Sequence, residues 1–203
     1  MQSIPFKDEV IAKLASEHPL HEIITTSNLF VDLVENIVCQ QLSGRVAEVI
    51  FKRFCSLFPN NAPTPELLLK ITIEQLRTVG LSNAKANYVQ NIASYTIVNN
   101  LTVSNFDSLT DEQIISELTK IKGVGVWTAQ MVLIFSLNRQ DVFPVGDLAI
   151  QQGMKKMYNL KVEGKELLSK IVSISETWKP YRTIGTRYVW KFVNLHKSLN
   201  TRA

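Results

Sequence analysis

The chain has 203 residues, of which 45% are hydrophobic and 20% charged, and its formal net charge is +4. This size and apolar content suit one globular unit or two small lobes that share a core. The first twenty residues mix charged and apolar side chains, and the longest purely apolar run spans only 131–135. Neither a secretory signal nor a membrane span is therefore expected, and we predict a soluble, intracellular protein.

The number of cysteines excludes some kinds of site, and the distribution of charge bears on the kind of partner. Two cysteines, Cys39 and Cys55, are too few for a disulfide framework or a four-thiolate metal site, and we expect buried free thiols. Residues 153–203 carry eleven Lys or Arg against three Asp or Glu, whereas residues 1–152 carry eleven against fifteen. A basic C-terminal quarter is typical of nucleic-acid binding, although solvated helix faces explain it nearly as well.

Apolar residues recur at helical spacing along the chain, and the alternation of strands is almost absent. The fold class is therefore predicted to be all-α. Helices are expected at about 29–42, 45–58, 83–97, 126–138, 148–158, 163–176 and 181–198.

Several helix starts carry capping signals. Thr64 precedes a proline at the first helical position, and Ser82 can cap the helix that follows it. The sequences from Thr72 and from Thr110 each fit a capping box. Residues 76–86 and 118–129 each combine a helix end, a glycine turn and a new helix start, which indicates two αα-hairpins.

The second of these turns is Gly123-Val124-Gly125. Glycines there allow a reversal with positive φ and remove side chains that would block a ligand. The free N–H groups and the dipole of the following helix would form a seat for a phosphate. From these residues alone an ordinary helix–helix turn with a terminal glycine is the favoured interpretation.

The wider context of the turn resembles a known family. The stretch Leu118–Ala129, followed by Asp141–Asp147, resembles the helix–hairpin–helix motif and the aspartate loop of the DNA glycosylase superfamily. Cys39–Ser43 and Trp178–Arg182 resemble two further segments of one branch, the 3-methyladenine DNA glycosylase II group. The four segments keep the family's order, and the resemblance runs from about residue 29 to 195.

This resemblance implies a two-lobed helical fold with the active-site cleft between the lobes. One helical lobe is expected at about 28–138, with the hairpin at 118–129. The second lobe is expected at 139–203, together with an N-terminal helix within 1–27.

The resemblance also implies the chemistry. Asp147 becomes the catalytic carboxylate, which stabilises positive charge on the sugar and orients or deprotonates water. Its alternative role, capping the helix that begins at Leu148, is compatible with catalysis. Asp141 becomes a structural residue of the loop. Trp127 occupies the place where bifunctional relatives have a lysine nucleophile, and it cannot form a Schiff base, so the enzyme is expected to be monofunctional even though Lys122 stands nearby.

Aromatic residues are implied around the extruded base. Trp127 and Tyr181 match pocket positions, Trp178 and Met131 are expected to line the same pocket, and Trp190 lies close by in the sequence. Electron-rich rings attract cationic alkylated purines. Met131 stands where some relatives have tyrosine. Core packing is the alternative for these side chains, and it is the preferred interpretation for Trp190.

Two segments are implied at the DNA. Gly123, Val124, Gly125 and Thr128 would bind the backbone of the duplex. The turn of Gln41, Leu42 and Ser43 would fill the gap that the extruded base leaves, with Leu42 as the plug or, alternatively, as an ordinary core leucine.

We therefore expect a monomeric, monofunctional DNA glycosylase of base excision repair, located with the genome. Its partner would be double-stranded DNA with alkylated purines of the 3-methyladenine and 7-methylguanine type. No cofactor is expected, nor an iron–sulfur cluster, because no cysteine follows Cys55. A monovalent cation could bridge the hairpin carbonyls and a phosphate. The alternatives are a non-catalytic binder of damaged or unusually structured DNA, and a glycosylase for oxidised or mismatched bases.

Overall fold

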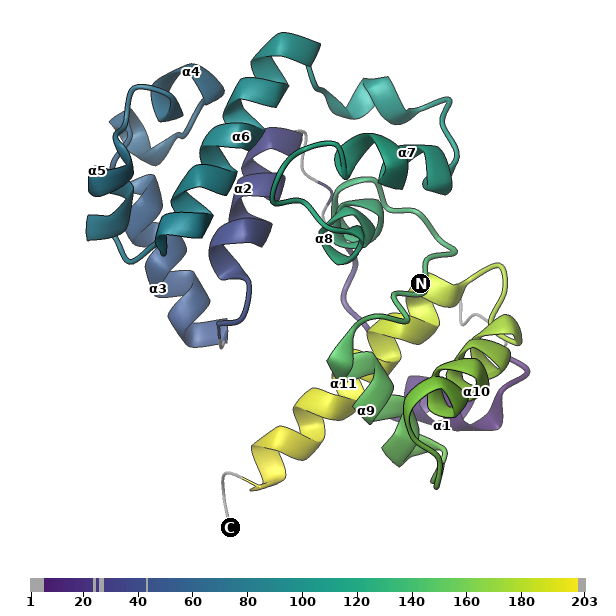
Figure 1. Ribbon diagram of the computed structural model, residues 1–203. Coiled ribbons are helices and arrows are strands. Elements are labelled where there is room, and N and C mark those ends of the chain that lie inside the picture. Colours follow the sequence, from purple (N-terminus) through teal and green to yellow (C-terminus); the bar gives the residue numbers. More distant parts are fainter. Residues whose placement is uncertain (1–5, 24, 26–27, 43, 201–203) are drawn as a thin grey trace. The chain divides into compact units, whose positions relative to one another are not determined.

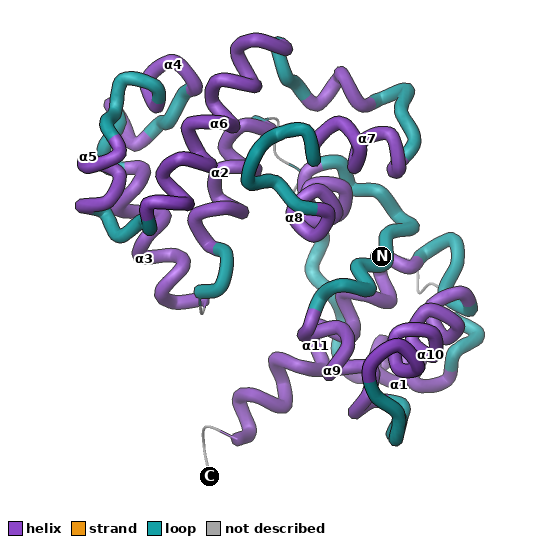
Figure 2. The backbone as a smooth tube through the Cα atoms, viewed as in Figure 1, coloured by secondary structure: helices purple, strands orange, loops and turns teal. Residues whose placement is uncertain are grey.

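A computed structural model describes residues 6–23, 25, 28–42 and 44–200, with side chains as far as residue 196. Within these ranges the regular structure is helical and no β-strand is present (Figure 2), which confirms the predicted all-α class. The chain divides into two compact units, residues 25–137 and residues 1–24 with 138–203. No helix in the described ranges is long and apolar enough to cross a bilayer.

The unit of residues 25–137 is organised around the helix α2 (Figure 1). Its helices are α2 (Leu29–Cys39), α3 (Gly44–Cys55), α4 (Pro65–Leu68), α5 (Ile73–Thr78), α6 (Asn83–Asn99), α7 (Asp111–Leu118) and α8 (Val126–Met131), with 3₁₀ turns at Pro59–Asn61 and Val103–Phe106. The helix α2 packs against α3, α6 and α8. Its buried side chains form one broad apolar face, which is wide enough to contact several neighbouring helices: Leu29, Phe30, Leu33, Val34, Ile37 and Val38.

The predicted capping signals are confirmed. The Thr72 and Thr110 hydroxyls accept from the backbone N–H three residues later. The Oε1 atoms of the glutamines at those positions accept in turn from the backbone N–H of the two threonines. Thr64 and Ser82 cap α4 and α6 in the same way, with single bonds of 3.3 and 3.2 Å. Each of these contacts spans three residues, so local sequence suffices to predict it.

Each of the two glycine turns has one glycine in a left-handed backbone conformation. Gly80 and Gly123 have φ of +103° and +108°, which only glycine adopts readily. The prediction of a positive φ at Gly125 is wrong. Gly125 is the N-cap of α8 with φ −95° and ψ 174°, an extended conformation open to most residues. The helix after this turn is also shorter than predicted, since α8 passes at Val132 into a π-helical turn that ends at Ser136.

The other unit contains α1 (Glu9–Glu17), α9 (Leu148–Met157), α10 (Gly164–Glu176) and α11 (Arg182–Asn200). The helix α11 packs against α1, α9 and α10. Their apolar faces form one core, whose buried members are Ile11, Ile150, Met154, Leu167, Ile171, Trp178, Tyr188 and Val189. The N-terminal helix is thereby part of the same core as the C-terminal helices.

Asp8 fastens α1 to this core. Its Oδ1 caps the helix by accepting from Val10 N and Ile11 N at 3.0 and 3.1 Å. Its Oδ2 accepts from the Tyr158 hydroxyl at 2.8 Å and from Trp178 Nε1 at 3.0 Å. Burial and the bond to Asp8 raise the pKa of Tyr158, because both disfavour the phenolate form.

Candidate active site

Asp147 is the last residue before α9 and caps that helix, as its local sequence indicates. Its Oδ1 accepts from Ala149 N at 2.7 Å and from Ile150 N at 3.0 Å. The backbone turns immediately before it, with Asp147 N donating to Pro144 O at 2.9 Å. The residue is 8% exposed. The cap therefore orients the carboxylate through one oxygen.

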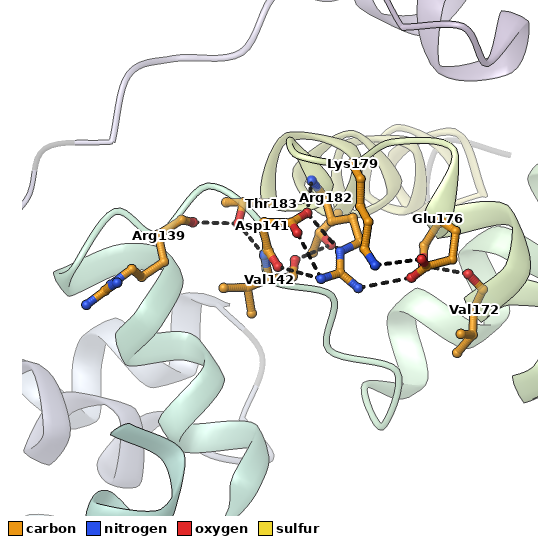
Figure 3. A network of polar contacts seen from close by, with 10 residues as sticks. Arg139, Asp141, Val142, Val172, Glu176, Lys179, Arg182 and Thr183 are labelled. Carbon is orange, nitrogen blue, oxygen red and sulfur yellow. Dashed lines mark hydrogen bonds and ion pairs between the residues drawn. The ribbon is translucent and has the colours of Figure 1, made fainter. Parts of the chain in front are cut away.

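The segment that leads to Asp147 is fastened by an ion pair (Figure 3). The Arg182 guanidinium donates to both carboxylate oxygens of Asp141, from Nε at 2.8 Å and from Nη2 at 3.0 Å. Arg182 also binds Glu176, which in turn pairs with Lys179 at 2.6 Å. A bidentate arginine–carboxylate pair fixes direction as well as distance. Asp141 thus has a structural contact that matches the role implied for it.

Two threonines of α11 continue this attachment. The Thr183 hydroxyl donates to Arg139 O at 2.6 Å and accepts from Val142 N at 3.0 Å. The Thr186 hydroxyl donates to Val142 O at 3.2 Å. Both threonines are fully buried, so these bonds are shielded from water. Sequence analysis missed both residues, because their partners lie more than forty positions away.

Trp178 is a core residue, and the prediction that it lines the base pocket is wrong. It is 1% exposed and bonded to Asp8, and its ring meets the Phe143 ring edge-on at a centroid distance of 5.8 Å. It also lies so close to Gly185 that a Cβ there would approach Cε3 to 2.3 Å. Trp190 packs against the same core, as preferred, whereas Tyr181 is 39% exposed. Tyr181 is therefore an exposed aromatic of this unit that a ligand can reach.

In the other unit, the two hairpin glycines serve different purposes. A Cβ on Gly123 would lie 2.3 Å from Cγ of Tyr88, so both its φ and its packing require glycine. A Cβ on Gly125 would meet no heavy atom of the described structure within 4 Å, neighbouring residues aside. Neither backbone conformation nor packing therefore requires glycine at position 125, where it serves as an N-cap and leaves room for a ligand to approach the backbone.

The remaining hairpin residues are less accessible than expected. Val124 and Thr128 are only 5% and 1% exposed. Their side chains are therefore not available to DNA, and the predicted DNA contact can involve only their backbone atoms. The Thr128 hydroxyl accepts from Gln40 Nε2 at 3.0 Å instead. Trp127, by contrast, is 37% exposed on α8, whereas Met131, which was also predicted in the base pocket, is only 4% exposed. Trp127 is thus the accessible aromatic of α8.

The turn between α2 and α3 carries the predicted plug. Gln41 is exposed and has φ +59°, and Leu42 is half-buried with its N–H donating to Cys39 O at 3.2 Å. Ser43, predicted as part of the same segment, lies outside the described residues. Sequence analysis missed Lys85, whose ammonium binds this turn from α6.

The cysteines are free and half-buried, less enclosed than predicted. Partial burial and the nearby Glu35 raise the pKa of Cys39 to about 11, and the same causes raise the pKa of Cys55. Neither thiol is therefore activated as a nucleophile. Within the described residues, no three His, Cys, Asp or Glu side chains gather where they could hold a metal ion.

The helical fold, the glycine hairpin before α8 and the capping aspartate before α9 agree with the resemblance to helix–hairpin–helix DNA glycosylases. The family model described as "HhH-GPD superfamily base excision DNA repair protein" matches residues 34–177. The chain belongs to this superfamily.

Its relatives include proteins named as 3-methyladenine DNA glycosylases. DNA-3-methyladenine glycosylase 1 of Schizosaccharomyces pombe is 35% identical over 184 residues, which cover 89% of this chain and 79% of that protein. A solved structure of an S. pombe 3-methyladenine DNA glycosylase with abasic DNA has a TM-score of 0.80 and 34% identity, covering 90% of this chain and 89% of that one. A Bacillus halodurans DNA-3-methyladenine glycosidase has a TM-score of 0.78 and 33% identity, covering 94% and 87%.

Proposed function

We propose that this protein is a monofunctional DNA glycosylase that removes alkylated purines, of the 3-methyladenine and 7-methylguanine type, in base excision repair. The observation that carries the proposal is similarity to 3-methyladenine glycosylases over 89% of the chain. Within that matched fold, Asp147 follows the hairpin and is held by the N-terminus of α9. The relative's structure with abasic DNA supports DNA as the partner, and we propose that this DNA is double-stranded.

Asp147 would act on the sugar. Cleavage of the N-glycosidic bond builds positive charge on the deoxyribose, and a fixed carboxylate stabilises that charge. Water then completes the hydrolysis, oriented or deprotonated by the same carboxylate. Because two amides and the anchored loop hold Asp147, little reorientation is needed when the charge develops.

The exposed aromatics would select the base. A cationic alkylated purine is attracted by the face of an electron-rich ring more than a neutral base is. Trp127 and Tyr181 have accessible rings and are the residues proposed for this contact. Cationic bases also leave readily, so the mechanism does not depend on a general acid.

The hairpin would hold the DNA backbone. The first amides of α8 lack intrahelical acceptors, and the open space at Gly125 allows a phosphate to approach them. Because Trp127 cannot form a Schiff base, strand cleavage is not part of the proposed reaction. Monomeric action and a monovalent cation at the hairpin carbonyls stay predictions, and no step here depends on the cation.

The test is base release from methylated DNA by the wild-type protein and by Asp147→Asn. Asparagine is as good an N-cap as aspartate, so the fold should persist while the charge is lost. We expect release to fall by at least about a hundredfold, the scale of one lost electrostatic contact in a transition state. Binding to DNA with an abasic-site analogue should remain.

Asp107→Asn serves as the matched control, because it removes one exposed carboxylate outside the site. It should release bases at the wild-type rate. An Asp147→Asn protein as active as the wild type would contradict the assignment of the carboxylate. A wild-type protein that binds damaged DNA without releasing a base would replace the enzyme with a non-catalytic binder.

A further inference from the structure

The turn after α2 is held by a lysine from a distant part of the sequence. Lys85, in the first turn of α6, donates from Nζ to Val38 O at 2.8 Å and to Gln40 O at 2.7 Å. Carbonyls at the end of a helix lack intrahelical partners, and a cation there also interacts favourably with the helix dipole. Lys85 therefore caps α2 at the point where the chain turns toward Leu42.

Gln40 ties the same turn to a second helix. Its backbone leaves the helix with φ −50° and ψ 135°, and its Nε2 donates to the Thr128 hydroxyl of α8 at 3.0 Å. Thr128 adjoins Trp127, the accessible aromatic of α8. The turn is thus bonded to α6 on one side and to α8 on the other.

The conformation that these bonds hold is costly. Gln41 has φ +59°, a left-handed conformation that costs a residue with a side chain roughly 1–2 kcal/mol. Such a conformation persists where the surroundings determine it, and it is frequent at functional sites. Gln41 is exposed and Leu42 half-buried, so this strained residue lies at the surface and not within the core.

We infer that Lys85 and Gln40 are positioning residues that hold the Gln41–Leu42 tip rigid and in register with α8, so that it can enter the DNA stack as the base leaves. The inference rests on the proposed glycosylase function. Extrusion of a base costs a few kcal/mol, and ordering a loose tip would add roughly 1–2 kcal/mol for each residue. Fastening the tip in the free protein removes that second cost from the reaction.

The test compares duplex DNA with single-stranded DNA, both methylated with dimethyl sulfate. Lys85→Met keeps the length of the side chain and removes the ammonium that binds the two carbonyls. We expect kcat/KM for base release from the duplex to fall at least tenfold, with release from the single strand within about twofold of wild type. A single strand has no stack to fill, so it does not require the tip.

Two variants serve as controls. Lys85→Arg keeps the cation and should restore most of the duplex activity. Lys70→Met removes an equivalent charge from an exposed lysine and should leave both substrates unaffected. If Lys85→Met does not fold, Thr128→Val tests the hydrogen bond between Gln40 and Thr128 instead. Valine keeps the volume of threonine and removes the hydroxyl that accepts from Gln40 Nε2. The same selective loss on duplex DNA is expected from it.

A double-mutant cycle with Leu42→Ala identifies the route of the effect. If Lys85 acts through the tip, Lys85→Met should reduce duplex activity by less than twofold once Leu42 is truncated. Equal losses on both substrates, or full additivity with Leu42→Ala, would overturn the inference while leaving the glycosylase function intact. A wild-type protein inactive on both substrates would overturn the proposed function and the inference with it.

Discussion

Gly125→Asp separates the two explanations of the hairpin, an ordinary turn or a seat for phosphate. Gly125 is an N-cap with extended φ and ψ, and a Cβ on it would have no heavy atom of the described structure within 4 Å, neighbouring residues aside. Aspartate is among the best N-cap residues and suits the positive end of a helix. The substitution should therefore leave stability unchanged or raise it by a few tenths of a kcal/mol.

The effect on DNA should be the opposite. A carboxylate at Gly125 would accept from the amides that a phosphate needs and would repel the phosphate as well. Two unit charges about 4 Å apart repel by roughly 1 kcal/mol in bulk water and by about 4 kcal/mol at an effective dielectric constant of 20. Since about 1.4 kcal/mol corresponds to a factor of ten, we expect affinity to fall by at least fivefold, and by several hundredfold at the upper limit.

The assay is fluorescence anisotropy with lesion-containing and undamaged duplexes over a range of salt, together with thermal unfolding. A backbone contact carries no sequence information, so both duplexes should lose affinity to a similar degree. The slope of log affinity against log salt should become shallower by about 0.9 for each lost phosphate contact. Gly125→Ser adds a neutral cap and should weaken binding less. A folded Gly125→Asp protein with wild-type affinity for undamaged DNA would remove the hairpin from the interface.

Two further predictions concern the fold and the reaction. Asp8→Ala should lower the free energy of unfolding in urea by about 3 kcal/mol or more, because it removes a helix cap and leaves the donors of Tyr158 and Trp178 without their acceptor; a loss under about 1 kcal/mol would contradict the structural role of this cluster. Product DNA should stay unbroken until alkali is added, and a borohydride-trapped protein–DNA adduct would show instead that a lysine such as Lys122 acts where Trp127 cannot.

The corrected position of Trp178 changes the expected base pocket. The residue belongs to a motif that resembles the family, yet its ring fills the core and its Nε1 is bonded to Asp8. Its ring contacts the ring of Phe143, which belongs to the loop that leads to Asp147. A substitution of Trp178 should therefore act on stability and on the loop, whereas a substitution of the exposed Tyr181 should act on the base.

The sequence by itself determined the features that depend on near neighbours. The all-α class follows from apolar periodicity, and the caps at Thr72, Thr110 and Asp147 follow from bonds that span two or three residues. Gly123 was also predictable, because a helix end followed by glycine indicates a left-handed turn. The reaction proposed for Asp147 came from resemblance, since a capping aspartate and a catalytic one look alike in sequence.

Tertiary structure decided which side chains are accessible and which distant residues hold the site. Lys85 reaches Gln40 across 45 positions, and Trp178 reaches Asp8 across 170, so no local pattern indicates either contact. Thr128 and Trp127 are neighbours on α8, yet Thr128 is buried and bonded to Gln40, whereas Trp127 is exposed. The physical reason is that periodicity predicts which face of a helix is apolar, whereas accessibility depends on what the rest of the chain packs against that face.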